Sequence, residues 1–225
     1  MNALTSNVKF ENSLLQDSFI QFTGLNTNLA IFNTSVYNCT SGDHDIPLFV
    51  LQTMYSYQAS LSIDNSTFSN NQSPILYATQ LHDISVENTI YLKNGQTTSN
   101  DGSLITISAF SILLQNLKFN QSSQTPIKVL DVTTNLTARN LVFSFNNGSK
   151  GSCFFINRHS NISLKHSFFE SNTNPVIYIK DKDGVNIVVK VSHNYAQPLT
   201  FFCSNMMQHS YPPSCNIVPA VCVDK

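Results

Sequence analysis

Residues 61–77, LSIDNSTFSNNQSPILY, form the unit that this chain repeats. Apolar and polar residues alternate up to an Asn, a Phe follows three residues later, and a Ser/Pro turn leads into a second apolar segment. With Phe68 as the anchor, the same frame returns every 22–32 residues, at Phe10, Val36, Phe68, Tyr91, Phe119, Phe143, Phe169 and Val191. A repeat of this length, built from short strands and turns, predicts a solenoid.

Asparagine dominates two columns of this alignment. Three residues before the anchors stand Asn7, Asn33, Asn65, Asn88, Asn116, Asn140, His166 and Val188. Three residues after the anchors stand Ser13, Cys39, Asn71, Asn94, Ser122, Asn146, Asn172 and Asn194. Asn accepts left-handed backbone angles, and its amide group can donate to one copy while accepting from the next. We therefore expect sharp bends at both columns, and Asn ladders that run along the stack of repeats.

Two apolar segments flank these bends. Positions seven and five before the anchor are mostly apolar, as at Leu61 and Ile63, which predicts a strand with one buried face. The second segment is apolar at nearly every position and starts at Ser18, Pro47, Pro74, Ser103, Pro126, Ser152, Pro175 and Pro198. With a third, shorter strand at the anchor, the pattern predicts an all-β protein. Its expected fold is a single-stranded right-handed parallel β-helix of about eight coils with Asn ladders.

The FSNN and FNQS segments carry a family resemblance, because each is followed by a small residue or Pro and then by an apolar strand. They look like the Phe-x-x-Asn repeat of polymorphic outer membrane proteins. More broadly, residues 5–202 resemble the pectin-lyase-like, right-handed parallel β-helix repeats of large surface proteins from bacteria and protists. Ser-Pro or Thr-Pro stands here where the bacterial repeat has a Gly-Gly-Ala-Ile strand start. The resemblance implies the fold, which hosts lyases, hydrolases, adhesins and inert stalks alike.

The repeats divide the chain in two. We expect the β-helix over residues 1–202, and a cap or the start of a Cys-rich region over residues 203–225, with no further coil after Ser204. The first residues lack the apolar core of a signal peptide and enter coil one directly. An uncovered end exposes strand edges, so we expect either a segment of a longer protein or another subunit over that end.

Composition narrows the class of partner. Only 11% of the residues are charged, against roughly 25% in an ordinary domain. The net charge is −1 with no basic cluster, which argues against nucleic-acid binding. No apolar run reaches the roughly 18 residues of a membrane span. We expect an extracellular or cell-surface protein that contacts copies of itself, other surface proteins or glycans.

Two kinds of covalent modification follow from that location. Cys203, Cys215 and Cys222 are close in sequence, and we expect one disulfide among them. Asn-x-Ser/Thr triplets outside the ladder columns predict glycosylation at outer turns, at Asn38, Asn120, Asn135, Asn147 and Asn161.

Catalytic candidates are few. Lyases and hydrolases of this fold group carboxylates with a basic residue on one face. Opposite charges fall in neighbouring columns of consecutive coils at Asp131, Arg158 and Asp181, with Asp183 close behind, and these four are the candidates if the chain is an enzyme. The alternative is a surface ion pair between Arg158 and Asp181. The residues Gly42 to Asp45 have metal-ligand types without a defining spacing, and we expect neither metal nor cofactor.

Three functions remain open from the sequence. The leading hypothesis is a non-enzymatic extracellular β-helix module with a structural, adhesive or filament-forming role in a larger surface or secreted protein. One alternative is a carbohydrate-active domain of the polysaccharide lyase or hydrolase type. The other is a glycan-binding module without chemistry.

Overall fold

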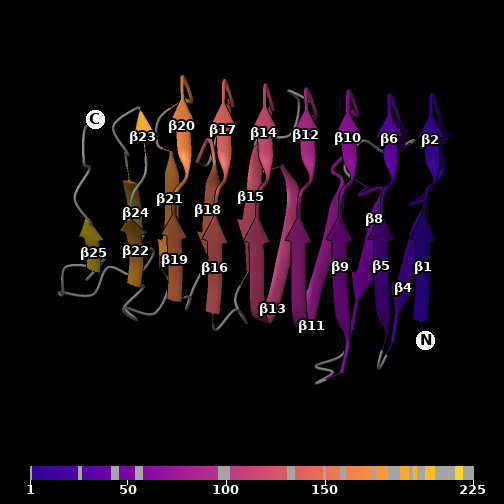
Figure 1. Ribbon diagram of the computed structural model, residues 1–225, viewed down its shortest axis with the longest axis horizontal. Coiled ribbons are helices and arrows are strands. Elements are labelled where there is room, and N and C mark those ends of the chain that lie inside the picture. Colours follow the sequence, from indigo (N-terminus) through magenta and orange to yellow (C-terminus); the bar gives the residue numbers. More distant parts are fainter. Residues whose placement is uncertain are drawn as a thin grey trace.

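The chain forms a right-handed parallel β-solenoid, which confirms the predicted fold. The computed structural model describes residues 2–24, 27–41, 46–53, 58–95, 102–130, 135–148, 151–157, 161–173, 176–181, 188–192, 195–196, 201–205 and 216–219. All of the described elements are strands, and every pairing between them is parallel. The coils stack as successive rungs from β1 toward β25 (Figure 1).

A 15-stranded sheet provides two of the ladders of the solenoid. The strand that precedes each anchor belongs to the first ladder: β1 (Asn2–Ser6), β5 (Asn28–Phe32), β9 (Ser60–Asp64), β11 (Leu76–Glu87), β13 (Ser103–Gln115), β16 (Asn135–Arg139), β19 (Asn161–Lys165) and β22 (Val188–Ser192). β25 (Asn216–Pro219) pairs with β22 and ends this ladder among the described strands. The second ladder contains β4 (Ile20–Thr23), β8 (Phe49–Gln52), β15 (Thr125–Val129), β18 (Phe154–Asn157), β21 (Ile177–Asp181) and β24 (Phe201–Asn205). The long strands β11 and β13 run through both ladders and join them.

The anchors form a separate eight-stranded sheet. Its members are β2 (Lys9–Glu11), β6 (Ser35–Tyr37), β10 (Thr67–Ser69), β12 (Ile90–Leu92), β14 (Lys118–Asn120), β17 (Val142–Ser144), β20 (Phe168–Glu170) and β23 (Tyr195–Ala196). A short pair, β3 (Leu14–Leu15) and β7 (Thr40–Ser41), lies beside the first coils. The register confirms the first seven anchors. The eighth is Ala196, which pairs with Phe169, whereas the predicted Val191 belongs to β22 and pairs with Leu164.

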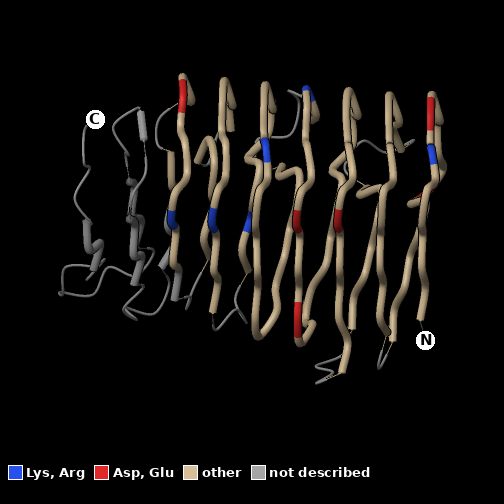
Figure 2. Tube along the Cα trace, viewed as in Figure 1, with Lys and Arg blue, Asp and Glu red and all other residues tan. Residues whose placement is uncertain are grey.

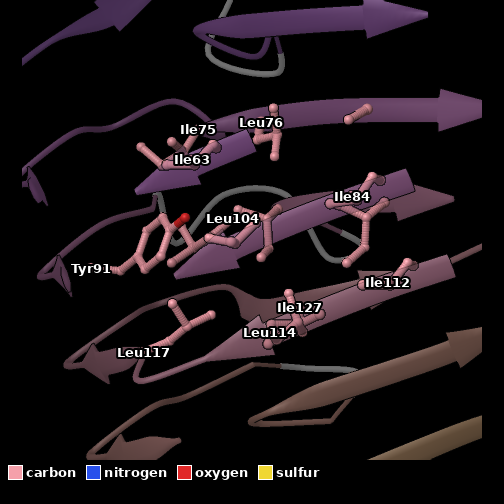
Figure 3. Close-up of a cluster of buried hydrophobic side chains, with 14 of the residues drawn as sticks. Ile63, Ile75, Leu76, Ile84, Tyr91, Leu104, Ile112, Leu114, Leu117 and Ile127 are labelled. Carbon is pink, nitrogen blue, oxygen red and sulfur yellow. The ribbon is translucent and has the colours of Figure 1, made fainter. Parts of the chain in front are cut away.

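The core lies between the ladders and follows the predicted columns. Leu61 and Ile63 are 1% exposed, and the corresponding residues of the neighbouring coils are equally buried. The anchor rings stack on one another, with centroids 5.2 Å apart from Phe68 to Tyr91 and 4.6 Å apart from Tyr91 to Phe119. Apolar side chains of the first ladder, the second ladder and the anchor sheet meet in the core, as Ile63, Leu76 and Tyr91 show (Figure 3). The prediction that the aromatic anchors are core residues is therefore confirmed.

Two columns of left-handed residues turn the chain at each coil, and one of them differs from the prediction. Three residues before the anchor, φ is 45–56° at Asn7, Asn33, Asn65, Asn88, Asn116, Asn140 and His166, as expected. The second bend lies two residues after the anchor, at Asn12, Asn38, Asn70, Lys93, Gln121, Phe145 and Ser171. The described Asn residues at the third position, Asn71, Asn94, Asn146 and Asn172, are instead buried, and their Nδ2 groups donate to backbone carbonyl oxygens.

An exposed ladder and a buried ladder result. In the exposed ladder, Asn140 Nδ2 donates to Asn116 Oδ1 at 3.0 Å, and Asn116 Nδ2 donates to Asn88 Oδ1 at 2.8 Å. The ladder also joins Asn65, Asn33 and Asn7, while Asn88 Nδ2 donates to Asp64 Oδ1. In the buried ladder, Asn71 donates to Asn94 and Asn146 donates to Asn172. The predicted Asn ladders are confirmed.

Two further details of the register differ from the sequence analysis. Ser103 pairs with Thr125, so the fifth of the second-segment strands starts at Thr125, and Pro126 is its second residue. At the C-terminal end, β24 covers the expected boundary between residues 202 and 203, and β25 pairs with β22. One further strand therefore pairs in parallel after Ser204, and the expected division of the chain at residue 203 stays a prediction.

Candidate functional surface

The strands of the first ladder pair in register, so their outward face repeats the same positions from strand to strand. Along each strand, alternate side chains enter the core, so the remaining positions line up in outward columns. From β5 to β19, small hydroxyl and amide side chains dominate the first two columns, whose described side chains are Asn28, Ser60, Ser62, Ser85, Ser111, Asn135, Thr137 and Ser163 together with Ala30, Asp83 and Leu113. All of them are partly or fully exposed. We call this surface the polar face.

The third outward column of the polar face carries charge. Strand register places Ser6, Phe32, Asp64, Glu87, Gln115, Arg139 and Lys165 side by side on consecutive strands. Two acidic residues are followed by Gln115 and then by two basic residues. Figure 2 shows acidic and basic positions of neighbouring coils at the same level along the strands. We call Asp64, Glu87, Gln115, Arg139 and Lys165 the charge column.

Neighbouring groups hold part of the charge column in place. Asn88 Nδ2 donates to Asp64 Oδ1 at 2.8 Å, and Ser85 Oγ donates to Glu87 Oε1 at 2.8 Å. On the basic side, Arg139 Nε donates to Gln115 Oε1 at 2.8 Å. The column therefore combines partly exposed carboxylates, which accept hydrogen bonds from polar neighbours, with exposed cations. The residues of the charge column all stand four positions before their anchors, and this offset is the signal in the sequence that could have predicted the column.

A second polar feature lies where β11 bends. The register between β11 and β13 shifts after Ala78, and Gln80 adopts a φ of 62°, which together mark a β-bulge. Close to it, His82 Nδ1 lies 2.6 Å from Asp83 Oδ2, and the His82 ring stacks on Phe110 at 5.7 Å. Phe110 is 51% exposed. This corner presents an aromatic surface beside a carboxylate.

The predicted catalytic group remains a prediction. Asp131, Arg158 and Asp183 lie outside the described residues, as do Asp43, His44 and Asp45. Asp181 is the last residue of β21, and its backbone pairs with Asn205. Within the residues that the structure describes, no three His, Cys, Asp or Glu side chains gather where a metal could bind.

The predicted modification sites occupy different environments. Asn38 is exposed at a bend, where its Nδ2 donates to Asn12 Oδ1 at 2.8 Å, and Asn147 is exposed in a loop. Asn120, Asn135 and Asn161 lie on strands β14, β16 and β19, so the prediction that they occupy turns was wrong. Each is the first or last residue of its strand, and the sequence pattern did not define these strand ends. Asn120 Oδ1 is buried without a hydrogen-bond partner among the described residues. Glycosylation itself stays a prediction at all five.

The cysteines of the described core are free thiols. Cys39 and Cys153 are both buried, and burial raises the pKa of the Cys153 thiol well above its ordinary value. A buried neutral thiol of this kind acts as a small apolar residue. Cys203 lies on β24, whereas Cys215 and Cys222 fall outside the described residues, so their disulfide remains a prediction.

No protein-family model, curated protein or solved structure matches the chain. The part of the chain that the structure describes also contains no helix long and apolar enough to cross a membrane.

Proposed function

We propose that this chain is a non-enzymatic structural and adhesive module of a surface or secreted protein, and that it works through its polar face. The regular alignment of small polar side chains and charges on consecutive parallel strands carries this proposal. Such a surface is extended and rigid, because parallel strand pairing joins the described coils and the anchor rings stack from Phe68 to Phe169. It suits contact along a line of many residues more than it suits the enclosure of one small molecule.

Sequence properties support the extracellular part of the proposal. The Phe-x-x-Asn segments resemble the repeats of polymorphic outer membrane proteins, and the surface derives its polarity from Asn, Ser and Thr more than from charge. Long solenoid surfaces of stacked repeats commonly serve as binding surfaces. We therefore place the module outside the cell, as part of a larger assembly.

An adhesion assay tests the role of the polar face. Beads coated with the chain are presented to beads coated with the same chain and to surfaces coated with neutral or acidic polysaccharide. Thr137→Arg adds a long cation at the centre of the polar face, and Ser35→Arg adds the same group at an exposed position of β6, in the other sheet. We expect adhesion that Thr137→Arg abolishes and that Ser35→Arg preserves.

Two results would overturn the proposal. The first is the absence of adhesion to any of these surfaces, or adhesion that Thr137→Arg leaves unchanged. The second is enzymatic turnover: release of unsaturated sugar ends from acidic polysaccharide, in the presence of calcium, that Arg158→Ala abolishes. That second result would establish the lyase alternative.

The corner formed by His82, Asp83 and Phe110 favours glycan binding as a second function. An exposed aromatic ring beside a carboxylate offers an apolar surface and a hydrogen-bond acceptor, which together fit the face and the hydroxyl groups of a sugar. Oligosaccharides titrated into the chain should shift the NMR signals of Phe110 and His82. Phe110→Ala should remove the binding, and shifts that persist in this variant would exclude the corner.

A further inference from the structure

The order of charges in the charge column is unfavourable within one molecule. Asp64 pairs in register with Glu87, and Arg139 pairs in register with Lys165. Like charges directly opposite on neighbouring strands destabilise a sheet. Among the described residues, the close contacts between basic and acidic side chains join Lys9 to Glu11 and His82 to Asp83, so neither pair of like charges in the charge column is neutralised by an opposite charge there. An arrangement with this cost points to a partner that carries the reversed order.

The same chain carries that reversed order. Gln115 stands at the centre of the charge column, with the acids on one side and the bases on the other. A twofold axis parallel to the strands, lying between two polar faces at the level of Gln115, reverses the stacking direction of the second copy. It then places Asp64 against Lys165 of the second copy, and Glu87 against Arg139 of the second copy.

We propose that the polar face binds a second copy of this chain in a twofold dimer centred on Gln115. Each contact occurs twice in such an isologous interface, so the charge column provides four complementary ion pairs. This inference rests on the proposed function, since it names the partner of the same face.

The remaining columns of the polar face are compatible with close approach. The same twofold axis brings Ser62 against Ser163 of the second copy, and Ser85 against Thr137 of the second copy. Leu113, which is partly exposed on β13, meets Leu113 of the second copy at the centre. Small side chains around one apolar contact let two flat faces come together, while larger side chains would hold the charges apart.

The size of the surface sets the expected affinity. Five strands about 4.8 Å apart, with five residues of about 3.3 Å each, cover about 400 Å² per copy. The total of about 800 Å² lies below the range of standard stable interfaces, so we expect a reversible dimer with a Kd on the order of 10–100 µM. Exposed ion pairs are screened by salt, with a Debye length of about 10 Å at 0.1 M and about 3 Å at 1 M. The dimer should therefore dissociate at high salt.

Charge exchange tests the proposal by sedimentation equilibrium of the 225-residue chain at low salt. Asp64→Lys/Glu87→Lys makes the charge column entirely basic, and Arg139→Glu/Lys165→Glu makes it entirely acidic. Each double variant should raise the Kd at least tenfold, because attraction becomes repulsion. An equimolar mixture of the two double variants should form a heterodimer, and the fourfold variant should regain the wild-type Kd.

A matched control changes the same number of charges elsewhere. Lys93→Glu/Lys118→Glu alters two exposed cations beside or on the anchor sheet, and we expect it to leave the dimer unchanged. Circular dichroism of every variant verifies folding, and recovery of dimerisation in the mixture cannot come from misfolded chains.

Two outcomes overturn the inference: a wild-type chain that stays monomeric up to about 200 µM at low salt, or a mixture that associates no better than its components. The adhesion assay distinguishes this failure from failure of the proposed function. Adhesion that Thr137→Arg abolishes, without complementation between the charge variants, retains the polar face and assigns it a different partner.

Discussion

Replacing Asn146 by Ala should reveal how much the buried Asn ladder stabilises the solenoid. Asn146 is 1% exposed. Its Nδ2 donates to Asn172 Oδ1 at 2.9 Å and to the Phe119 carbonyl oxygen at 3.2 Å. Its Oδ1 accepts from the Ser122 backbone N–H at 3.0 Å. One side chain thus links three consecutive coils in the interior of a bend.

The magnitude follows from the groups that Ala would leave behind. The buried Ser122 N–H would lose this acceptor, and two buried oxygens would lose a donor. A buried polar group left without a partner costs about 1–3 kcal/mol. Because a carbonyl oxygen can accept more than one hydrogen bond, we expect a total loss of about 2–4 kcal/mol in the free energy of unfolding. That is a large part of the roughly 5–15 kcal/mol that stabilises a typical domain.

Asn140→Gly is the matched control from the exposed ladder. Asn140 Nδ2 donates to Asn116 Oδ1 at 3.0 Å, and its φ is 55°, which Gly tolerates. Because water replaces the lost bond at this exposed position, we expect a loss of only about 0.5–1 kcal/mol. Urea unfolding of both variants, followed by circular dichroism, measures the difference. Equal losses, or a loss below about 1 kcal/mol for Asn146→Ala, would refute the idea that the buried ladder carries the larger share.

Four further changes follow from single contacts, and thermal or urea unfolding measures each. Ser122→Asn should raise the free energy of unfolding by about 1 kcal/mol, because Ser122 Oγ is buried without a partner among the described residues and Asn completes the column. Tyr91→Phe should be neutral or stabilising by up to about 1 kcal/mol, because the buried Tyr91 hydroxyl also lacks a partner among the described residues. Burial raises the Tyr91 pKa, so the folded state resists ionisation and stability should fall as the pH rises above about 10, less steeply in Tyr91→Phe. Gly151→Ala should lower the free energy of unfolding by at least about 2 kcal/mol, because φ is 84° and an added Cβ would lie 2.1 Å from the Phe154 carbonyl oxygen. Phe145→Asn should raise it by about 0.5–1 kcal/mol, because Phe145 is 51% exposed at a φ of 55° that suits Asn better.

The sequence predicts the buried columns and the exposed ladder well, for a physical reason. In-register stacking gives each position of the repeat the same environment in every coil, so the same residue type recurs. The repeat can be recognised from Leu61, Ile63, Asn65 and Phe68, because each of these positions lies beside the equivalent position of the neighbouring coils. Periodicity therefore carries information about packing even in a single sequence.

The position of the second bend was harder to predict, because two adjacent columns share a residue type. Asn70 and Asn71 follow each other, yet Asn70 has a φ of 54° and Asn71 is 1% exposed. Asn is favoured at a left-handed bend by its backbone preference, and inside the bend by its two-sided hydrogen bonding. An Asn in the sequence therefore does not by itself indicate which of the two roles its position has. The next coil distinguishes the bend column from the buried column, because it has Lys93 at the bend and Asn94 at the buried position. A Lys at the buried position would carry an uncompensated charge, so Lys93 marks the exposed bend.

The charge column shows why the proposed functional surface is hard to predict from composition or from motifs. Asp64 and Arg139 are 75 residues apart in sequence, and no local pattern joins them. They share a column only because each stands four positions before an anchor, and only the alternation of the strand decides that this position faces outward. Aligning the repeats on their anchors brings two acids, one Gln and two bases into line, in an order that the proposed second copy would complement in reverse.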